Sequence, residues 1–200
     1  MARPFARMSD STPDSIGPRI AKVRVMPSSA EAPAQGGADS FAEGGCDCRF
    51  VRYRLATAPM FVHCCHCRWC QRETGSAFAL NAMIEAERVA TLAGETEAVM
   101  TPSASGKGQR IVRCPRCRIA LWSHYAGAGD TICFVRVGTL DEPDRCPPDI
   151  HIFTASKQHW VLLPDGVPAF TEYYRASEVW PAASLERRAR LRAAQPRRAD

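Results

Sequence analysis

The sequence GGCDC at residues 44–48 and the sequence CPRC at residues 114–117 decide how this 200-residue chain folds. In an extended segment, residues two apart face the same side, so Cys46 and Cys48 direct their sulfurs at one point. A C-x-x-C turn brings the sulfurs of Cys114 and Cys117 together. Two such pairs complete a tetrahedral Cys₄ zinc site, with Zn–S bonds of about 2.3 Å. Because the pairs lie about 65 residues apart, the metal is expected to join the beginning of the folded region to its middle.

The sequence CCHCRWC at residues 64–70 forms a second cluster. If this segment is extended, Cys65 and Cys67 share a face, and a C-x-x-C turn returns Cys70 to them. Three thiolates then converge without an evident fourth protein ligand. Structural zinc sites have four protein ligands, whereas catalytic sites keep one position open. The pattern therefore predicts an open Zn(Cys)₃ site that binds a substrate thiol and lowers its pKa.

The two remaining candidate ligands of this cluster, Cys64 and His66, are expected to point the other way. A β-bulge would undo that alternation and let one of them close the second site. The site would then be purely structural. The sequence leaves this alternative open.

The state of the ten cysteines of the chain depends on the cellular compartment in which the protein is located. The N-terminus has no apolar segment typical of a secretion signal, and no stretch approaches the roughly 18 apolar residues of a membrane helix. We therefore expect a cytoplasmic protein with reduced thiols, which favours metal ligation over disulfides. Cys133 lies in a strand-like run and is expected to be a buried core residue, while no role follows for Cys146. Three isolated histidines are interpreted as structural: His124, His151 and His159.

Three regions are predicted along the chain. Residues 1–40 are rich in Ser, Pro, Ala and Gly and are expected to be a flexible extension. Residues 41–174 contain every Cys and His and carry equal numbers of acidic and basic residues, and they are predicted to form the zinc-binding domain. Residues 175–200 carry seven Arg against three acidic residues. This basic tail includes a possible short helix at 182–195 but is interpreted as solvated.

The central region shows the alternation of β-strands. Alternating segments occur at 50–55, within 76–84, at 119–125 and within 132–140, and turn-forming residues separate them. A turn or two of helix is expected at 85–92. The predicted fold class is mainly β, a small zinc-bound structure of antiparallel sheets.

The motifs resemble those of a known family. In chain order they are GGCDC (44–48), CHCRWCQR (65–72), TGSAF (74–78), CPRC (114–117), VGTLD (137–141), HIF (151–153), and WV with PDGVPAF within 160–170. Together they are similar to the glutathione-dependent formaldehyde-activating enzyme family, also called the GFA or CENP-V/GFA domain, over about residues 41–172. The family usually has Gly where this chain has Arg49 and Arg118. A residue with positive φ at those turns costs a non-Gly roughly 1–2 kcal/mol, which metal binding of about 10 kcal/mol can absorb.

The resemblance implies a β-tent fold with two zinc ions. By position, the structural zinc ligands would be Cys46, Cys48, Cys114 and Cys117, and the catalytic zinc ligands would be Cys65, Cys67 and Cys70. The implied activity is that of a carbon–sulfur lyase, the reversible condensation of formaldehyde with glutathione to S-(hydroxymethyl)glutathione. The expected partners are a small thiol and a small aldehyde, without a membrane.

Candidates for the remaining roles are few. His66 or Ser76 could protonate the product oxygen, and the carboxylates of glutathione would need cations, for which the candidates are Arg68, Arg72 and Lys107. Two other functions compete with the enzyme. One is a non-enzymatic binding module with two structural zinc ions. The other, a nucleic-acid-binding zinc protein, is disfavoured because the central region carries no net charge.

A chain shortened to begin near Ser40 is expected to keep its fold. The deleted residues contain no cysteine and little apolar periodicity, so they can bury little surface to offset ordering entropy. Thermal unfolding measures this. A large drop in midpoint would show instead that the alternating run at 20–26 pairs as an edge strand.

Overall fold

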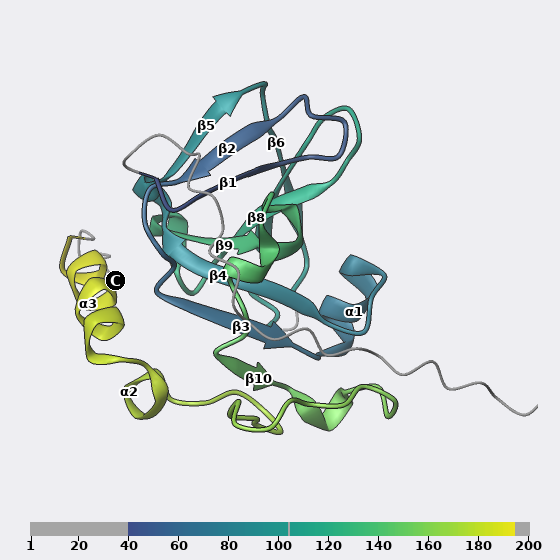
Figure 1. Cartoon of the computed structure of the whole chain (residues 1–200), viewed down its shortest axis with the longest axis vertical. Coiled ribbons are helices and arrows are strands. Elements are labelled where there is room, and N and C mark those ends of the chain that lie inside the picture. Colours follow the sequence, from purple (N-terminus) through teal and green to yellow (C-terminus); the bar gives the residue numbers. More distant parts are fainter. Residues whose placement is uncertain (1–39, 104, 195–200) are drawn as a thin grey trace, which may run out of the picture. The chain divides into compact units, whose positions relative to one another are not determined.

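The computed structural model describes residues 40–103 and 105–194, so the predicted extension and the run at 20–26 lie outside the described residues. Two β-sheets dominate the described part, which is mainly β as predicted (Figure 1). The smaller sheet has the order β1-β2-β5, with β1 at Ala42–Gly45, β2 at Arg52–Leu55 and β5 at Val89–Ala93.

The larger sheet has seven strands in the order β10-β3-β4-β9-β8-β7-β6. Its strands are β3 (Phe61–Cys65), β4 (Ala79–Glu85), β6 (Glu97–Thr101), β7 (Gln109–Arg113), β8 (Ala120–Tyr125), β9 (Ile132–Arg136) and β10 (Ile150–Ile152). The sheet is antiparallel except at one edge, where β10 runs parallel to β3 with His151 opposite Cys64. The parallel pair departs from the expected antiparallel arrangement, and it brings a late segment of the chain beside the CCHC sequence.

Of the turn or two of helix expected at 85–92, the structure has one short turn, and the rest of the range is a strand. A single 3-10 turn, Ala86–Arg88, is followed at once by strand β5. β5 pairs with β2, with Val89 opposite Leu55 and Thr91 opposite Tyr53. Backbone pairing and the β-branched side chains of this segment therefore outweigh the helical pattern.

The helices are few. α1 spans Arg68–Thr74, α2 spans Ala176–Val179 and α3 spans Ala182–Ala194. None of the helices between residues 40 and 194 combines the length and the apolar character needed to cross a membrane.

The first hydrophobic core contains residues of both sheets. Tyr53 and Leu55 of the small sheet and Ile84 and Leu121 of the large sheet are fully buried in one cluster. Cys133 is 2% exposed in the same cluster, so its prediction as a core residue is confirmed. The alternation of β-strands sends these side chains to one face of the large sheet.

The opposite face of the large sheet carries a second hydrophobic core. Phe61, Cys65 and Met83 from β3 and β4 join Tyr174 and Trp180 from the C-terminal segment. The rings of Phe61 and Trp180 are stacked with centroids 5.1 Å apart. The C-terminal segment therefore packs on the face opposite the small sheet.

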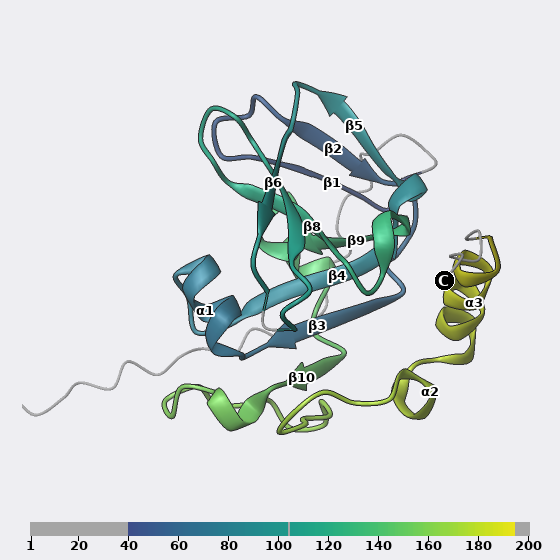
Figure 2. The same ribbon diagram turned by 180° about the vertical axis from the view of Figure 1, so that it is seen from behind.

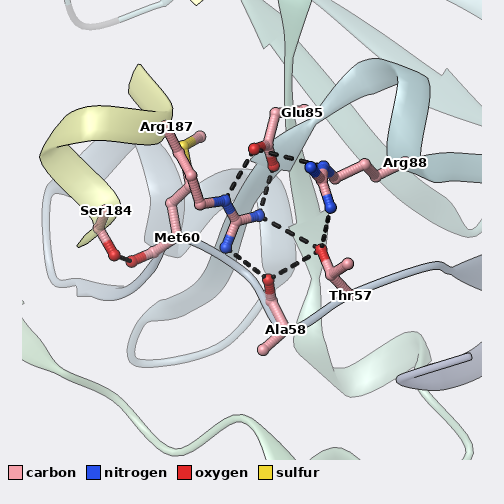
Figure 3. Close-up of polar contacts among 7 residues, drawn as sticks. All are labelled: Thr57, Ala58, Met60, Glu85, Arg88, Ser184 and Arg187. Atoms are coloured by element: carbon pink, nitrogen blue, oxygen red, sulfur yellow. Dashed lines mark hydrogen bonds and ion pairs between the residues drawn. The ribbon is translucent and has the colours of Figure 1, made fainter. Parts of the chain in front are cut away.

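Helix α3 is held in place by specific polar contacts rather than remaining a solvated tail (Figure 3). Ser184 Oγ donates to the carbonyl of Met60 at 2.6 Å. Arg187 reaches the carboxylate of Glu85 with Nε at 2.7 Å, and its Nη1 donates to the carbonyl of Ala58 at 2.9 Å. Burial is the largest single effect on the pKa of Glu85 and would raise it, but the hydrogen bond from Arg187, a backbone hydrogen bond and the charges of Arg187 and Arg88 together lower this pKa below its ordinary value.

We predict that Arg187→Gln destabilises the protein by about 2 kcal/mol, because the buried Glu85 carboxylate loses its hydrogen-bonded partner and keeps only Arg88, whose Nε lies 3.4 Å from Oε1. The Glu85 side chain is 4% exposed and that of Arg187 is 21% exposed. A carboxyl with a lowered folded-state pKa stabilises the fold above its unfolded pKa. Its contribution is lost on acidification, so the difference between variant and wild type should shrink as the pH falls below about 4.

Chemical denaturation of both proteins at several pH values measures this difference. Arg190→Gln is the matched control, because Arg190 lies on the same helix and, among the described residues, its ion pair is with the exposed Glu186. Equal stability of the two variants at neutral pH would contradict the assigned contact.

Candidate metal centres and the adjoining pocket

Four thiols converge where β1 and β7 end. The sulfurs of Cys46, Cys48, Cys114 and Cys117 all lie within 4.8 Å of one another. Cys48 Sγ is 3.5 Å from Cys46 Sγ and 3.7 Å from Cys114 Sγ. A tetrahedral metal with metal–sulfur bonds of about 2.3 Å requires sulfurs about 3.8 Å apart. The predicted C-x-C and C-x-x-C pairs therefore meet with a geometry that fits a zinc ion.

The turns beside these cysteines have the predicted strained backbone. Arg49 has φ 59° and Arg118 has φ 66°. The amide of Arg49 donates to the carbonyl of Cys46, and the amide of Arg118 donates to the carbonyl of Cys114, both at 3.0 Å. The two arginines therefore adopt the conformation for which the family uses glycine.

Glycine is required immediately before the first pair. A Cβ on Gly44 would lie 2.5 Å from the carbonyl oxygen of Thr139, and a Cβ on Gly45 would lie 2.4 Å from the carbonyl oxygen of Val51. The amide of Val51 in turn donates to Cys46 Sγ at 3.2 Å. The glycine pair thus lets the backbone approach closely enough to orient the first ligand.

Backbone amides also favour the thiolate form here. The hydrogen bond from the amide of Ile119 contributes most to lowering the pKa of Cys117 to about 6. A thiolate is the form that binds a metal.

Three further thiols converge on the opposite side of the large sheet. Cys65 is the last residue of β3, Cys67 is the N-cap of α1, and Cys70 lies in the first turn of that helix. Their sulfurs lie within 4.8 Å of one another. Cys67 Sγ accepts a hydrogen bond from the amide of Cys70 at 3.3 Å. The start of a helix therefore supplies the turn that brings the third thiol back to the other two.

Proton sharing within this group favours a thiolate at its centre. Hydrogen bonds from Cys65 and then from Cys70 lower the pKa of Cys67. Because one sulfur is already stabilised as an anion by two neighbours, the group fits a metal cation that would replace the shared protons.

Cys64 and His66 lie on the other face and form a separate group with His151. Cys64 Sγ is 3.6 Å from His66 Nε2, and His66 Nε2 is 2.9 Å from His151 Nδ1. His66 is fully buried, and burial lowers its pKa to about 4. The arrangement does not support the alternative in which either side chain closes the group of Cys65, Cys67 and Cys70.

A pocket of about 500 Å³ opens at the three-thiol group. All three cysteines line it. Its apolar wall comprises Trp69, Met83, Phe134, Ile152, Phe153 and Tyr173. The polar groups on its surface include Asn81 and Tyr125, together with Lys107, Arg188 and Arg192. We call this cavity the thiol pocket.

Several residues proposed from the sequence lie elsewhere. Arg68, Arg72 and Ser76 line a different hollow, which none of the three thiols lines. Arg68 Nη1 donates to Gln71 Oε1 at 2.6 Å. Lys107 alone among the three proposed cations lines the thiol pocket.

Two other residues have structural contacts. His124 Nδ1 lies 3.1 Å from the carbonyl oxygen of Ile132. Cys146, for which the sequence indicated no role, is 1% exposed in the first hydrophobic core.

Sequence reasoning missed Asn81, Tyr125 and the two arginines of α3 as pocket residues. Tyr125 follows a strand-like alternation that indicates only burial. The arginines lie in a basic segment with no apolar face strong enough to predict where it packs. The spacing of Arg188, Leu191 and Arg192, at i, i+3 and i+4, was the one available signal that they share a helix face.

Comparison with profiles of protein families identifies the family of the chain. Residues 41–156 match the profile described as "Glutathione-dependent formaldehyde-activating enzyme", the GFA family. The chain belongs to the GFA family. Comparison with curated proteins gives no match. A crystal structure of a Rhodobacter sphaeroides protein from a structural genomics programme is similar at 18% identity and a TM-score of 0.39, covering 50% of this chain and 87% of that one.

Proposed function

We propose that this GFA-family protein is a zinc-dependent carbon–sulfur lyase that adds a small, glutathione-like thiol to formaldehyde or a related aldehyde. One observation carries the proposal. Cys65, Cys67 and Cys70 converge at the wall of a pocket of about 500 Å³, in a group that no fourth Cys, His, Asp or Glu among the described residues joins. A site with three protein ligands and access for a small molecule is the arrangement of catalytic zinc.

The two thiol groups are assigned different roles. Cys46, Cys48, Cys114 and Cys117 would hold a structural zinc ion, and Cys65, Cys67 and Cys70 would hold the catalytic one. Zinc bound at the second group supplies a positive centre that favours the thiolate form of a substrate thiol near neutral pH.

The reaction needs a carbon–sulfur bond and one proton transfer. The substrate sulfur attacks the carbonyl carbon, the π electrons of the C=O bond move to oxygen, and the proton lost by the thiol ends on that oxygen. The product is a hemithioacetal. The pocket walls hold the two reactants together, which raises their effective concentration.

Tyr125 is the proposed donor to the developing oxyanion. It lines the thiol pocket, and burial, followed by the charge of Cys70, raises its pKa. The hydroxyl therefore keeps its proton at neutral pH and can donate a hydrogen bond to the aldehyde oxygen. The earlier candidates are less suitable, because His66 is fully buried and Ser76 lines another hollow.

The competing function is a binding module with two structural metals. It would require a fourth protein ligand at the second group. The separate cluster of Cys64, His66 and His151 removes the two nearest candidates from that role.

We predict two zinc ions per chain with unequal retention. A mild chelator should remove the ion at Cys65, Cys67 and Cys70 first, because that group offers three ligands rather than four.

Cys46→Ser or Cys117→Ser should impair folding, since Cys48 and Cys114 are separated by 66 positions and their shared metal ties these segments together. Cys67→Ser should leave the fold largely intact, because its site closes only a short loop.

Metal analysis and thermal unfolding measure both effects, with Cys133→Ala as a buried cysteine control outside either thiol group. One zinc ion per wild-type chain, unchanged in Cys67→Ser, would refute the two-site assignment.

We predict that the wild-type protein accelerates glutathione–formaldehyde exchange above the uncatalysed rate. Cys67→Ser should reduce this excess to background. Tyr125→Phe should lower kcat about 100-fold, because it removes one hydrogen-bond donor to the oxyanion, while leaving the zinc content at two. Exchange NMR of the hydroxymethyl group measures the rates, with a protein-free sample as the baseline. Equal rates in the wild-type, Cys67→Ser and protein-free samples would reject the lyase and favour the binding module.

A further inference from the structure

A third group of side chains with metal-binding atoms lies apart from both thiol groups. Cys64, His66 and His151 place one sulfur and two ring nitrogens within 4.8 Å of one another. The proposed function uses none of these three side chains. Each of them is at most 5% exposed. Three side chains that can each bind a metal therefore meet in the interior of the protein.

The parallel pair of strands at the edge of the large sheet builds this group. Strand β10 runs beside β3 in the views of Figure 1 and Figure 2, with His151 opposite Cys64. His66 follows β3 directly, and its amide donates to the carbonyl of Ile152 at 3.0 Å. The carbonyl of His66 in turn accepts a hydrogen bond from Gln71 Nε2 at 2.6 Å. Backbone contacts thus hold the three side chains together before any ligand binds.

Hydrogen bonds within the group leave part of it unsatisfied. His66 Nε2 lies 3.6 Å from Cys64 Sγ and 2.9 Å from His151 Nδ1. Two neutral rings carry one proton each, and two nitrogens at this separation have room for one proton between them. The second proton lies on His66 Nδ1 or His151 Nε2, which are both buried without a hydrogen-bond partner among the described residues. The hydrogen-bonded form therefore leaves a buried N–H unpaired, which is costly.

A metal ion can bind all three of the inner atoms at once. With bonds of about 2.3 Å to sulfur and about 2.0 Å to nitrogen, a sulfur and a nitrogen on one metal lie about 3.5–3.7 Å apart. The 3.6 Å between Cys64 Sγ and His66 Nε2 fits this requirement. Two nitrogens on one metal lie about 3.3 Å apart, so the two rings would separate by a few tenths of an ångström. Their protons would lie on the outer nitrogens, where one proton already lies without the metal.

The charge of the group selects the kind of cation. A buried thiol and two buried imidazoles are neutral, because burial disfavours their charged forms. A monovalent cation that displaces the thiol proton to solvent leaves the site neutral. A divalent cation would leave one positive charge in the interior, and no Asp or Glu of the described residues joins the group to balance it. One thiolate with two imidazoles is also a donor set that suits copper.

We propose that Cys64, His66 and His151 form a third metal site, which binds one Cu(I) ion through one sulfur and two nitrogens. Binding breaks the S–H bond of Cys64, releases its proton to solvent, forms one Cu–S and two Cu–N bonds, and changes no oxidation state. The bound ion ties β10 to β3. The site is separate from the two zinc ions of the proposed function and does not depend on the lyase reaction.

Anaerobic titration of the zinc-loaded protein with Cu(I), against a chromophoric Cu(I) chelator, tests the site. Because the ligands are buried, the ion enters through local opening of β10, and the samples are equilibrated before measurement. We expect the first equivalent to bind while the zinc already present is retained. Cys64→Ser and His151→Gln should each weaken binding at least about 100-fold, because each removes one of three ligands. Serine and glutamine can still hydrogen-bond to His66, so both variants should keep the wild-type unfolding midpoint.

Cys133→Ser is the matched control. Cys133 is 2% exposed, and its sulfur lies 3.8 Å from His124 Nε2 in the same sheet. This buried Cys–His pair is joined by no third ligand among the described residues. The control variant should bind Cu(I) within about twofold of wild type, because it removes no ligand of the site.

X-ray absorption at the copper edge identifies the ligands in the wild-type protein, so the test does not depend on how the variants fold. We expect one sulfur and two nitrogens around each copper ion. Copper bound by sulfur alone, release of zinc by the first equivalent, or equal weakening by Cys133→Ser overturns the site. Equal affinity of Cys64→Ser and wild type also overturns it. A third zinc ion that is bound by wild type and absent from Cys64→Ser overturns the assignment of a monovalent cation.

Discussion

The two-residue period of strand β3 is the constraint on which the rest of the site depends. Cys64 points toward His66 and His151, while Phe61 and Cys65 lie in the cluster on the opposite face. A shift of one residue in the pairing with β4 would exchange these faces. Cys65 would then leave Cys67 and Cys70, and the three-thiol group at the wall of the thiol pocket would be lost. The register, with Cys64 opposite Leu80 and Cys65 opposite Ala79, is fixed because both faces of the sheet are buried.

The two faces of the large sheet serve different purposes. One face packs against the small sheet, and the four-thiol group lies at the edge of that core, with Cys46 and Cys114 buried in it. The other face carries the pocket and is covered by the C-terminal segment. Under the proposed function, a structural metal held by four thiols at the edge of the core and a catalytic metal held by three thiols beside the cavity would be a consistent division. Cys48 is exposed and Cys117 is half-buried, so the presence of a fourth thiol ligand, rather than burial, would leave no position open to a substrate at the first group.

The sequence predicted which thiols converge better than it predicted the residues of the pocket, and the reason is physical. Ligand spacing is local. The C-x-C and C-x-x-C pairs determine which sulfurs converge whatever the rest of the chain does, and the alternation separates Cys64 from Cys65. Pocket residues such as Tyr125 and Arg188 come together only through the sheet order and the docking of α3, which depend on long-range pairing. The missed strand β5 shows the same limit, because its backbone partner β2 lies more than thirty positions away.

For the proposed addition of a thiol to an aldehyde, positioning of the reactants would be the more important contribution of the pocket. A thiol held as a thiolate by a cation gains in ionised fraction, but its nucleophilicity falls as its pKa falls. The two effects partly cancel, so ionisation alone gives a modest acceleration of an addition that already proceeds without a catalyst. Holding the sulfur, the aldehyde and a hydrogen-bond donor in one orientation carries no such penalty.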